Sequence, residues 1–147
     1  MFKRILIPTD GSSLSRKAIR RAVQLAKEQK AAVTGIYVGP EWQPDRYGDS
    51  TLSGFVSPTQ HAAIVKKTAD RYLSPVRKAA AAAGVPCQCK HVLGSFPYEE
   101  IVKAAHRNRC DLIVMASHGR RGISRLLLGS ETSKVLAHSK IPVLVER

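Results

Sequence analysis

Cysteine is scarce in this sequence, and its three positions follow no zinc-finger or disulfide pattern. Cys87, Cys89 and Cys110 are odd in number and lack the second pair that a zinc finger requires. Cys87 and Cys89 alternate along an expected strand and therefore point to the same face of it. The simplest interpretation is a set of small core or surface thiols, with a redox role or a metal site as the alternatives.

Long apolar runs are also missing. No stretch approaches the roughly 20 apolar residues of a membrane-spanning helix, and the run Ile5–Ile7 is too short for the apolar segment of a signal peptide. We therefore expect no membrane span and a cytoplasmic location. Aromatic residues make up 5% and hydrophobic residues 44% of the sequence, a balance typical of one α/β domain, which we expect to extend over residues 1–147.

Acidic residues are few relative to basic ones. The 24 Lys and Arg against 11 Asp and Glu give a net charge of +13. Such a charge attracts nucleotides, nucleic acids or anionic surfaces without choosing among them. The sequence has no basic patch interleaved with aromatic residues and no recognition-helix signature, so nucleic acid is the less favoured partner.

Two common phosphate-binding motifs are absent. There is no G-x-x-x-x-G-K-[ST], which excludes a P-loop, and no G-x-G-x-x-G after the first expected strand. The second absence argues against a Rossmann dinucleotide site.

Strand and helix patterns alternate through the whole chain. Short apolar runs predict strands, and apolar residues at helical spacing predict the helices between them. We expect strands at residues 3–9, 32–38, 86–92, 112–116 and 141–145, and helices at about 14–26, 58–84, 97–108 and 131–138. This order predicts one parallel, doubly wound sheet with right-handed crossovers. Pro75 is expected to kink or restart the second helix.

A long connection, Gly39–Ser57, follows the second expected strand. It is rich in Gly, Pro, Ser and Asp and contains three isolated aromatic residues, Trp42, Tyr47 and Phe55. Connections of this length are either functional or mobile. The aromatic residues either fold over a site or pin the loop.

The segment Cys110–Ser130 carries the clearest functional signal. Its uniformly apolar run, 112–116, suits a strand buried on both faces. Gly119-Arg120-Arg121-Gly122 and then Gly129-Ser130 follow, before the last helix pattern. Glycines allow the backbone to approach a ligand closely, and the first-turn N–H groups of a helix attract anions. The segment therefore predicts a phosphate-binding site.

The end of the first expected strand offers a partner for this segment. Doubly wound sheets bind ligands beyond the carboxyl ends of their strands, where the strand order reverses. If the first and fourth strands are neighbours there, Pro8, Thr9 and Asp10 face residues 116–130 across one crevice. Asp10 would accept a hydrogen bond from a ribose or a base, or hold a divalent metal on the phosphates. The alternative is a loop residue bonded to the start of the first helix.

These residues resemble a known family. The chain is similar to universal stress proteins over nearly its whole length, in ILIPTDGS, in the long loop after the second strand, and in MASHGRRGISRLLLGS and IPVLVER. The nucleotide-binding branch of that family has a loop of the form G-x2-G-x9-G-[ST], which here reads Ala116-x2-Gly119-x9-Gly129-Ser130. The resemblance implies a single-domain, three-layer fold of the adenine nucleotide alpha hydrolase type, with helices on both faces of a five-stranded parallel sheet.

The resemblance also implies a site for an adenine nucleotide, usually ATP, otherwise AMP or ADP, with Mg²⁺ or Mn²⁺ as candidate metals. The adenosine side would be lined by the residues at three strand ends, Pro8, Thr9, Asp10, Val38, Met115 and Ala116.

On the phosphate side, the resemblance implies that Gly119 and Gly129 donate backbone N–H groups. The hydroxyls of Ser130 and Thr132 would add donors. His118 and Arg120 would either reach the phosphates or face water.

Two positions depart from the family pattern. Ala116 replaces the first glycine, which is tolerable at a negative φ but costs strain at a positive one. Glu131 places a carboxylate in the first turn of the last helix. That charge suits the helix dipole of an empty site but repels a triphosphate, unless the side chain points outward or shares a metal.

The last expected strand, Ile141–Val145, would leave an exposed apolar edge in a monomer. The resemblance implies that it pairs with the same strand of a second copy and forms a two-fold homodimer. Pro142, near the start of the strand, is compatible with this pairing.

The leading expectation is a non-enzymatic, dimeric stress-response or regulatory module whose long loop and protein partners respond to ATP occupancy. A slow ATP hydrolase is the first alternative. Arg120 or Arg121 would stabilise its transition state, although no residue is an obvious water-positioning group. A basic nucleic-acid-binding protein is the second alternative.

Overall fold

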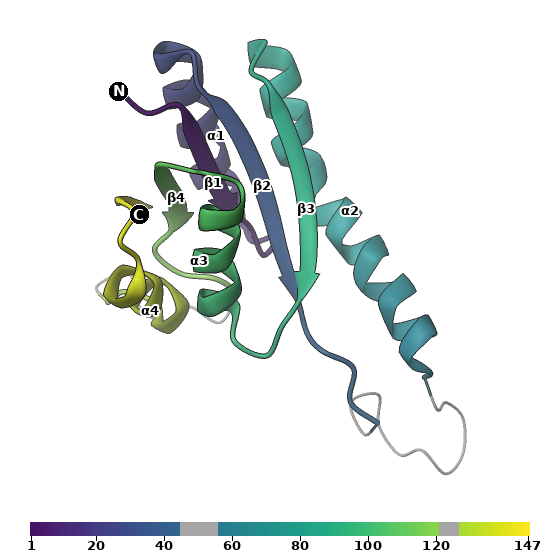
Figure 1. Ribbon diagram of the computed structural model, residues 1–147. Coiled ribbons are helices and arrows are strands. Elements are labelled where there is room, and N and C mark those ends of the chain that lie inside the picture. The colour runs from purple at the N-terminus through teal and green to yellow at the C-terminus, as the bar shows by residue number, and fades with distance from the viewer. Residues whose placement is uncertain (45–55, 121–126) are drawn as a thin grey trace.

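Strands and helices alternate along the chain as the sequence predicts (Figure 1). The protein is represented by a computed structural model that describes residues 1–44, 56–120 and 127–147. Its strands are β1 (Arg4–Pro8), β2 (Ala32–Gly39), β3 (Cys87–Leu93), β4 (Leu112–Ala116) and β5 (Val143–Glu146). Its helices are α1 (Ser13–Gln29), α2 (Pro58–Ala83), α3 (Pro97–Arg107) and α4 (Ser130–His138).

The strands form one parallel sheet in the order β3-β2-β1-β4-β5. Helices α1 and α2 pack on one face, and α3 and α4 pack on the other. The predicted doubly wound, three-layer α/β fold is therefore confirmed. None of the helices in the described part of the chain is long and apolar enough to cross a membrane.

Alternation along β1 supplies the core on both faces of the sheet. Ile5 and Ile7 are completely buried against α1, together with Ala22 and Ala26, while Leu6 faces the α3 side. Burying a side chain of this size contributes about 1.5–3 kcal/mol. Because β1 is covered on both faces, its carboxyl end is fixed in space, and this end carries Pro8, Thr9 and Asp10.

The register of β1 with β4 sets the place of the site. Ile5 pairs with Leu112 and Leu6 with Ile113, so the carboxyl ends of the two strands are adjacent. The strand order reverses between β1 and β4, because β2 and β3 lie on one side of β1 and β5 lies beyond β4. This is the neighbour relationship that the predicted crevice requires.

Helix α2 begins and ends as its sequence predicts. Ser57 and Gln60 form a capping box at its start, and Gly84 ends it in the left-handed conformation with φ of +70°. The helix continues through Pro75 and does not restart there.

Strand β5 is an edge strand, as expected, but it starts two residues later than the predicted Ile141. Val143 pairs with Ile113, and Glu146 at the end of the strand is buried. The carboxylate of Glu146 accepts a hydrogen bond from Arg21 Nε at 3.1 Å, so β5 is tied to α1.

Candidate functional site

A cavity of about 820 Å³ lies at the carboxyl ends of the strands, where the order of the sheet reverses. Its size falls within the range of about 300–1,000 Å³ that is usual for small-molecule sites. All thirteen residues that the sequence predicts for the site line this cavity: Pro8, Thr9, Asp10, Val38, Met115, Ala116, His118, Gly119, Arg120, Gly129, Ser130, Glu131 and Thr132.

Several lining residues are not predicted from the sequence. They come mainly from the end of β2 and from the loop between β3 and α3, and one comes from α2: Ser15, Ile36, Tyr37, Pro40, Glu41, Gln43, Tyr72, Gly94, Ser95, Pro97 and Ile101. Gly94 and Ser95 follow directly after a strand, and parallel strands all end at the edge of the sheet where ligands bind. Their position in the sequence would therefore have been enough to predict them as lining residues. Tyr72 lies in mid-helix, and no sequence pattern marks it.

The carboxylate of Asp10 joins the start of α1 to the glycine loop. Oδ1 accepts hydrogen bonds from Ser12 N and Ser15 Oγ, both at 3.0 Å, and Oδ2 accepts one from Arg120 N at 2.8 Å. Partial burial raises the pKa of Asp10, but the bonds from Ser12, Arg120 and Ser15 outweigh it and hold the pKa below the ordinary 3.8. Asp10 is therefore an anion that is bonded to the start of α1 and also lines the cavity.

Gly119 and Arg120 hold the glycine loop against this carboxylate. A Cβ at Gly119 would overlap Asp10 Oδ2, so only glycine fits beside the Asp10 carboxylate as it is placed. The Arg120 side chain runs away from the glycine loop: its Nε donates to the Asp10 carbonyl at 2.9 Å and its Nη2 to the Gly11 carbonyl at 3.3 Å. Its guanidinium therefore contacts the backbone of the β1–α1 turn.

The backbone N–H of Gly129 is not available to a ligand. It donates to the Ser117 carbonyl at 2.7 Å, which corrects the expectation that it would donate to phosphate. The cause is the close approach of the two chain segments, since a Cβ at Gly129 would lie 3.0 Å from that same carbonyl oxygen. Gly129 thus closes the loop and brings the start of α4 to the cavity.

The first turn of α4 supplies the donors instead. Helix α4 has Gly129 as its N-cap and no side-chain cap. The N–H groups of Ser130, Glu131 and Thr132 have no acceptor within the described ranges, and all three residues line the cavity. An uncapped helix N-terminus that opens into a cavity favours an anionic ligand group.

The hydroxyl of Thr132 also differs from its expected role. Thr132 is buried, and its Oγ1 donates to the Ala116 carbonyl at 2.8 Å. This bond fixes α4 to the end of β4 and leaves Ser130 as the exposed hydroxyl of the pair. Ala116 itself has no positive φ, so its methyl group costs no backbone strain at the position where the family pattern has glycine.

Glu131 points away from the start of its own helix. Its Oε2 accepts a hydrogen bond from the backbone N–H of Tyr98 at 2.9 Å, in the first turn of α3, and its Oε1 lies 3.7 Å from Lys134 Nζ. The N-cap of α3, Phe96, provides no side-chain bond. Glu131 therefore caps the neighbouring helix, which is one of the two arrangements expected to reduce repulsion of a phosphate.

His118 presents an unpaired ring nitrogen. Its Nδ1 lies 2.9 Å from Ser117 Oγ, while its Nε2 is buried and has no hydrogen-bond partner among the described residues. A buried polar atom without a partner is costly. Because His118 lines the cavity, a ligand atom would be able to satisfy this nitrogen.

The side chains do not form a ready-made metal site. No group of three or more His, Cys, Asp or Glu residues in the described part of the chain is arranged to hold a metal ion. The Asp10 carboxylate is already engaged by three donors. The side chains alone therefore assign no metal, and a Mg²⁺ or Mn²⁺ ion held mainly by nucleotide phosphates beside Asp10 stays a prediction.

The long connection after β2 is tied at both ends. Trp42 Nε1 donates to the Val56 carbonyl at 2.7 Å, and the buried His61 places Nε2 2.7 Å from the Pro40 carbonyl. Trp42 thus pins the loop and is not among the residues that line the cavity. Tyr47 and Phe55 lie outside the described residues, as does Arg121.

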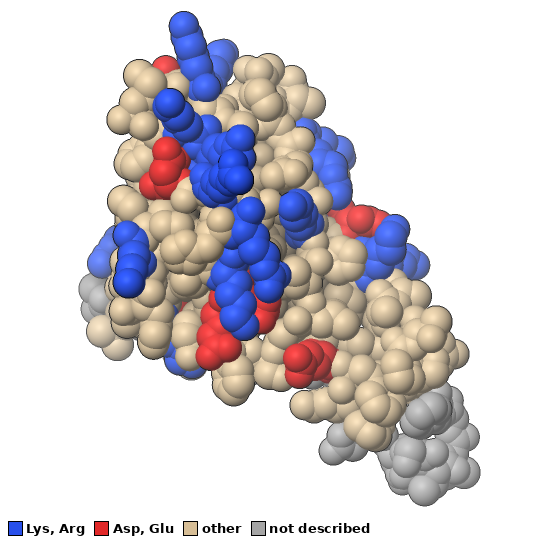
Figure 2. All heavy atoms as spheres, viewed as in Figure 1, with Lys and Arg blue, Asp and Glu red and all other residues tan. Residues whose placement is uncertain are grey.

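Lys and Arg side chains run down one face of the molecule, with acidic side chains beside several of them (Figure 2). Among the ion pairs of the described residues, Lys103 lies 3.3 Å from the carboxylate of Glu100 and 4.0 Å from that of Glu99. Surface pairs of this kind contribute at most about 1 kcal/mol. They also reduce the positive charge that the surface presents to nucleic acid.

Comparisons with known proteins agree with this geometry. The sequence profile of the Universal stress protein family matches residues 1–147. Universal stress protein YxiE of Bacillus subtilis is 36% identical over 152 residues and is covered, like this chain, over 100% of its length. The solved structure of MJ0577 of Methanocaldococcus jannaschii has a TM-score of 0.82 at 28% identity, covering 99% of this chain and 96% of that one. A universal stress protein solved in complex with cAMP has a TM-score of 0.67 at 26% identity, with coverages of 98% and 95%. The chain belongs to the universal stress protein family.

Proposed function

We propose that this universal stress protein binds an adenine nucleotide, with ATP as the leading candidate, in the cavity at the carboxyl ends of β1 and β4. The observation that carries the proposal is the uncapped first turn of α4, which opens into that cavity opposite Asp10. A related universal stress protein, 26% identical, has been solved in complex with cAMP, and this supports the class of ligand.

The phosphates would lie against the N–H groups of Ser130, Glu131 and Thr132, where the helix dipole favours negative charge. Gly119 would let the ligand approach the loop backbone, and the Ser130 hydroxyl would add a donor. His118 Nε2 would gain the partner that it lacks.

The adenosine would lie over the strand ends. Val38 and Met115 provide apolar surface for the base, and Ala116 narrows the pocket without strain. The backbone of Pro8 and Thr9 and the one remaining acceptor site of the Asp10 carboxylate would face the sugar or the exocyclic amine of the base.

Thermal unfolding tests the proposal. A ligand present at 100 times its dissociation constant stabilises the folded state by about 2.7 kcal/mol, which raises the melting temperature of a domain of this size by several degrees. We expect a rise with ATP and AMP, and a smaller one with adenosine, because only the phosphates reach α4. No rise with millimolar ATP would contradict the proposal.

We further propose that the protein is a cytoplasmic homodimer that pairs through β5 and acts as a regulatory module.

The open edge of β5 follows from its bonds to β4. Backbone bonds from Ile113 N to Pro142 O and from Ser117 N to Glu146 O show which residues of the β5 segment face β4. Since alternate residues face opposite ways, the N–H of Val145 points to the open edge. A Val145→Pro substitution should therefore leave the monomer folded but abolish the dimer in analytical ultracentrifugation. A dimer that survives Val145→Pro would contradict pairing through this edge.

The hydrolase alternative gains no specific support. The guanidinium of Arg120 is bonded to the carbonyls of Asp10 and Gly11, away from the first turn of α4. Arg121, the other candidate group, lies outside the described residues, so slow ATP hydrolysis stays the alternative to binding alone.

A further inference from the structure

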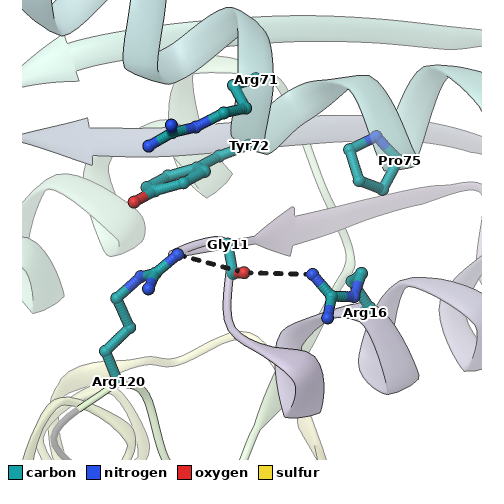
Figure 3. Close-up of a pocket in the computed structure, with 6 residues that line it drawn as sticks. All are labelled: Gly11, Arg16, Arg71, Tyr72, Pro75 and Arg120. Carbon is teal, nitrogen blue, oxygen red and sulfur yellow. Dashed lines mark hydrogen bonds between the residues drawn. The ribbon is translucent and has the colours of Figure 1, made fainter.

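A second, smaller cavity lies on the α1–α2 side of the Asp10 turn, with a volume of about 170 Å³. The described residues that line it are Gly11, Arg16, Arg71, Tyr72, Pro75 and Arg120 (Figure 3). Three of these six are arginines, and none is acidic. We call this group the arginine pocket. Sites for drug-sized ligands begin at about 300 Å³, so a cavity of this size suits a small ion or a single group of a larger ligand.

The three arginines come from separate parts of the chain and are held by different contacts. The guanidinium carbon of Arg71 lies 5.1 Å from the centroid of the Tyr72 ring, and that of Arg120 lies 4.9 Å from it. Figure 3 shows these two side chains on opposite sides of the ring, with Arg16 reaching the same Gly11 carbonyl as Arg120. Cation–π contacts of this kind hold a guanidinium flat and leave its edge N–H groups free to bond.

No carboxylate in the described part of the chain forms an ion pair with the arginines of this pocket, Arg16, Arg71 and Arg120. The side-chain hydrogen bonds that Arg16 and Arg120 donate to described residues go to the carbonyls of Asp10 and Gly11. Each guanidinium has five N–H donors and stays protonated at any ordinary pH. Like charges gathered around one cavity repel one another. An anion bound in the cavity would attract all of them and so offset this repulsion.

The ring of Tyr72, at the centre of the pocket, is held by contacts with Gly11 and Tyr37. Gly11 has a φ of +78°, and a Cβ there would overlap the Tyr72 ring, so the ring packs directly on the backbone. The Tyr37 ring meets Tyr72 edge-on, with centroids 5.3 Å apart. A rigid ring with cations on two sides makes the pocket a preorganised arrangement.

We propose that the arginine pocket is a phosphate-binding subsite, separate from the first turn of α4. Guanidinium groups bind phosphate through paired, charge-assisted hydrogen bonds, and three of them line this cavity without an ion pair to any described carboxylate. Tyr72 and Arg120 line both cavities, so the pocket opens beside the proposed nucleotide site. The bound group is either inorganic phosphate or a phosphate of a nucleotide whose base lies in the larger cavity.

Titration of the full-length, ¹⁵N-labelled protein with inorganic phosphate at constant ionic strength tests this subsite. The Nε–H signals of Arg16 and Arg71 should shift along one saturating curve, while that of Arg107, on the other face of the sheet, should not. Arg71→Gln and Arg16→Gln should each weaken phosphate binding by about tenfold or more, because each removes charge-assisted bonds. Arg107→Gln removes the same charge from an exposed position and should change the affinity for phosphate by less than about twofold.

Shifts that rise without saturation, or an equal effect of Arg107→Gln and Arg71→Gln, would overturn the subsite, since either result means general charge attraction. Arg16, Arg71 and Arg107 are all exposed, so circular dichroism should find each of the three variants folded.

Repeating the titration with ATP already bound identifies the source of the phosphate. Loss of phosphate binding means that a nucleotide phosphate occupies the pocket, and retained binding means a free anion. Both support the subsite. Nucleotide binding itself is followed separately at the backbone amides of Ser130 and Thr132, so its failure would be seen independently of the arginine signals.

Discussion

The Asp10 carboxylate accepts a 2.8 Å hydrogen bond from the backbone N–H of Arg120, across 110 positions of sequence. This bond joins the end of β1 to the glycine loop that follows β4. The same carboxylate also accepts bonds from Ser12 and Ser15 at the start of α1. One side chain therefore positions both walls of the cavity, and its removal should affect stability and binding together.

Asp10→Asn should lower the free energy of unfolding by about 1–2 kcal/mol at pH 7, because a charged acceptor of three hydrogen bonds is replaced by a neutral amide. The folded pKa of Asp10 is lowered from 3.8. Its contribution is therefore present above the unfolded pKa and is lost as the pH falls through the folded pKa. Urea unfolding at pH 7 and at successively lower pH should show the difference between Asp10→Asn and the natural protein shrinking below about pH 4.

Asp70→Asn is the matched control, since Asp70 is an exposed carboxylate whose one ion pair among the described residues is with Lys66 at 3.5 Å. Its effect should stay below about 0.5 kcal/mol. A difference for Asp10→Asn that does not change with pH would contradict the role given to the carboxylate.

A comparison of Gly11→Ala with Gly84→Ala distinguishes the cost of a strained backbone from the cost of steric overlap with the Tyr72 ring. Both glycines have positive φ, +78° and +70°, so both substitutions carry the left-handed penalty of about 1–2 kcal/mol. A Cβ at Gly84 meets nothing within 4 Å, whereas one at Gly11 overlaps the Tyr72 ring. Urea unfolding should show Gly11→Ala costing about 1–3 kcal/mol more than Gly84→Ala. Equal costs would mean that Tyr72 is not packed against the Asp10 turn.

Gly119→Ala should weaken nucleotide binding by about tenfold, because its Cβ would displace the Asp10 carboxylate from the loop. A double-mutant cycle with Asp10→Ala checks this cause. Asp10→Ala removes the atom that the new methyl group would meet, so the two substitutions should be strongly non-additive in calorimetric titration. Additive effects would mean that Gly119→Ala weakens nucleotide binding for a reason other than overlap with the Asp10 carboxylate.

Glu131→Gln should change stability and affinity in opposite directions. The carboxylate caps the first turn of α3 through Tyr98 N, so its loss should cost about 0.3–1 kcal/mol in urea unfolding. Removing a negative charge from the edge of the cavity should tighten ATP binding a few-fold. Glu28→Gln makes the same charge change on α1, away from the cavity, and should leave the affinity unchanged. Weaker ATP binding by Glu131→Gln would mean that this carboxylate contacts the ligand favourably.

The sequence is sufficient to predict the sheet and the strands that border the site. The short, uniformly apolar run at residues 112–116 marks a strand buried on both faces, and the alternating order of elements makes the sheet parallel. The polar residues that follow the strands then meet at one edge. All thirteen predicted lining residues, from Pro8 to Thr132, lie around one cavity for this reason.

The donors inside the site are not predictable in the same way. Gly129 N–H and Thr132 Oγ1 bond to the carbonyls of Ser117 and Ala116, because the loop folds back on the end of β4 more closely than a motif spacing can reveal. Tyr72 reaches the site from the middle of α2, and its place depends on how that helix packs against the Asp10 turn. Packing between distant segments decides both cases, and neither leaves a local sequence pattern.

The most direct test of the nucleotide site follows the backbone amides of Ser130, Glu131 and Thr132 during titration with AMP and ATP. The first turn of α4 should bind the phosphates, so these three signals should shift along a saturating curve, while those at the end of the same helix move little. Adenosine, which has no phosphate, should leave them nearly unchanged. Unchanged α4 amides at millimolar ATP, or equal shifts with adenosine, would contradict the proposed site.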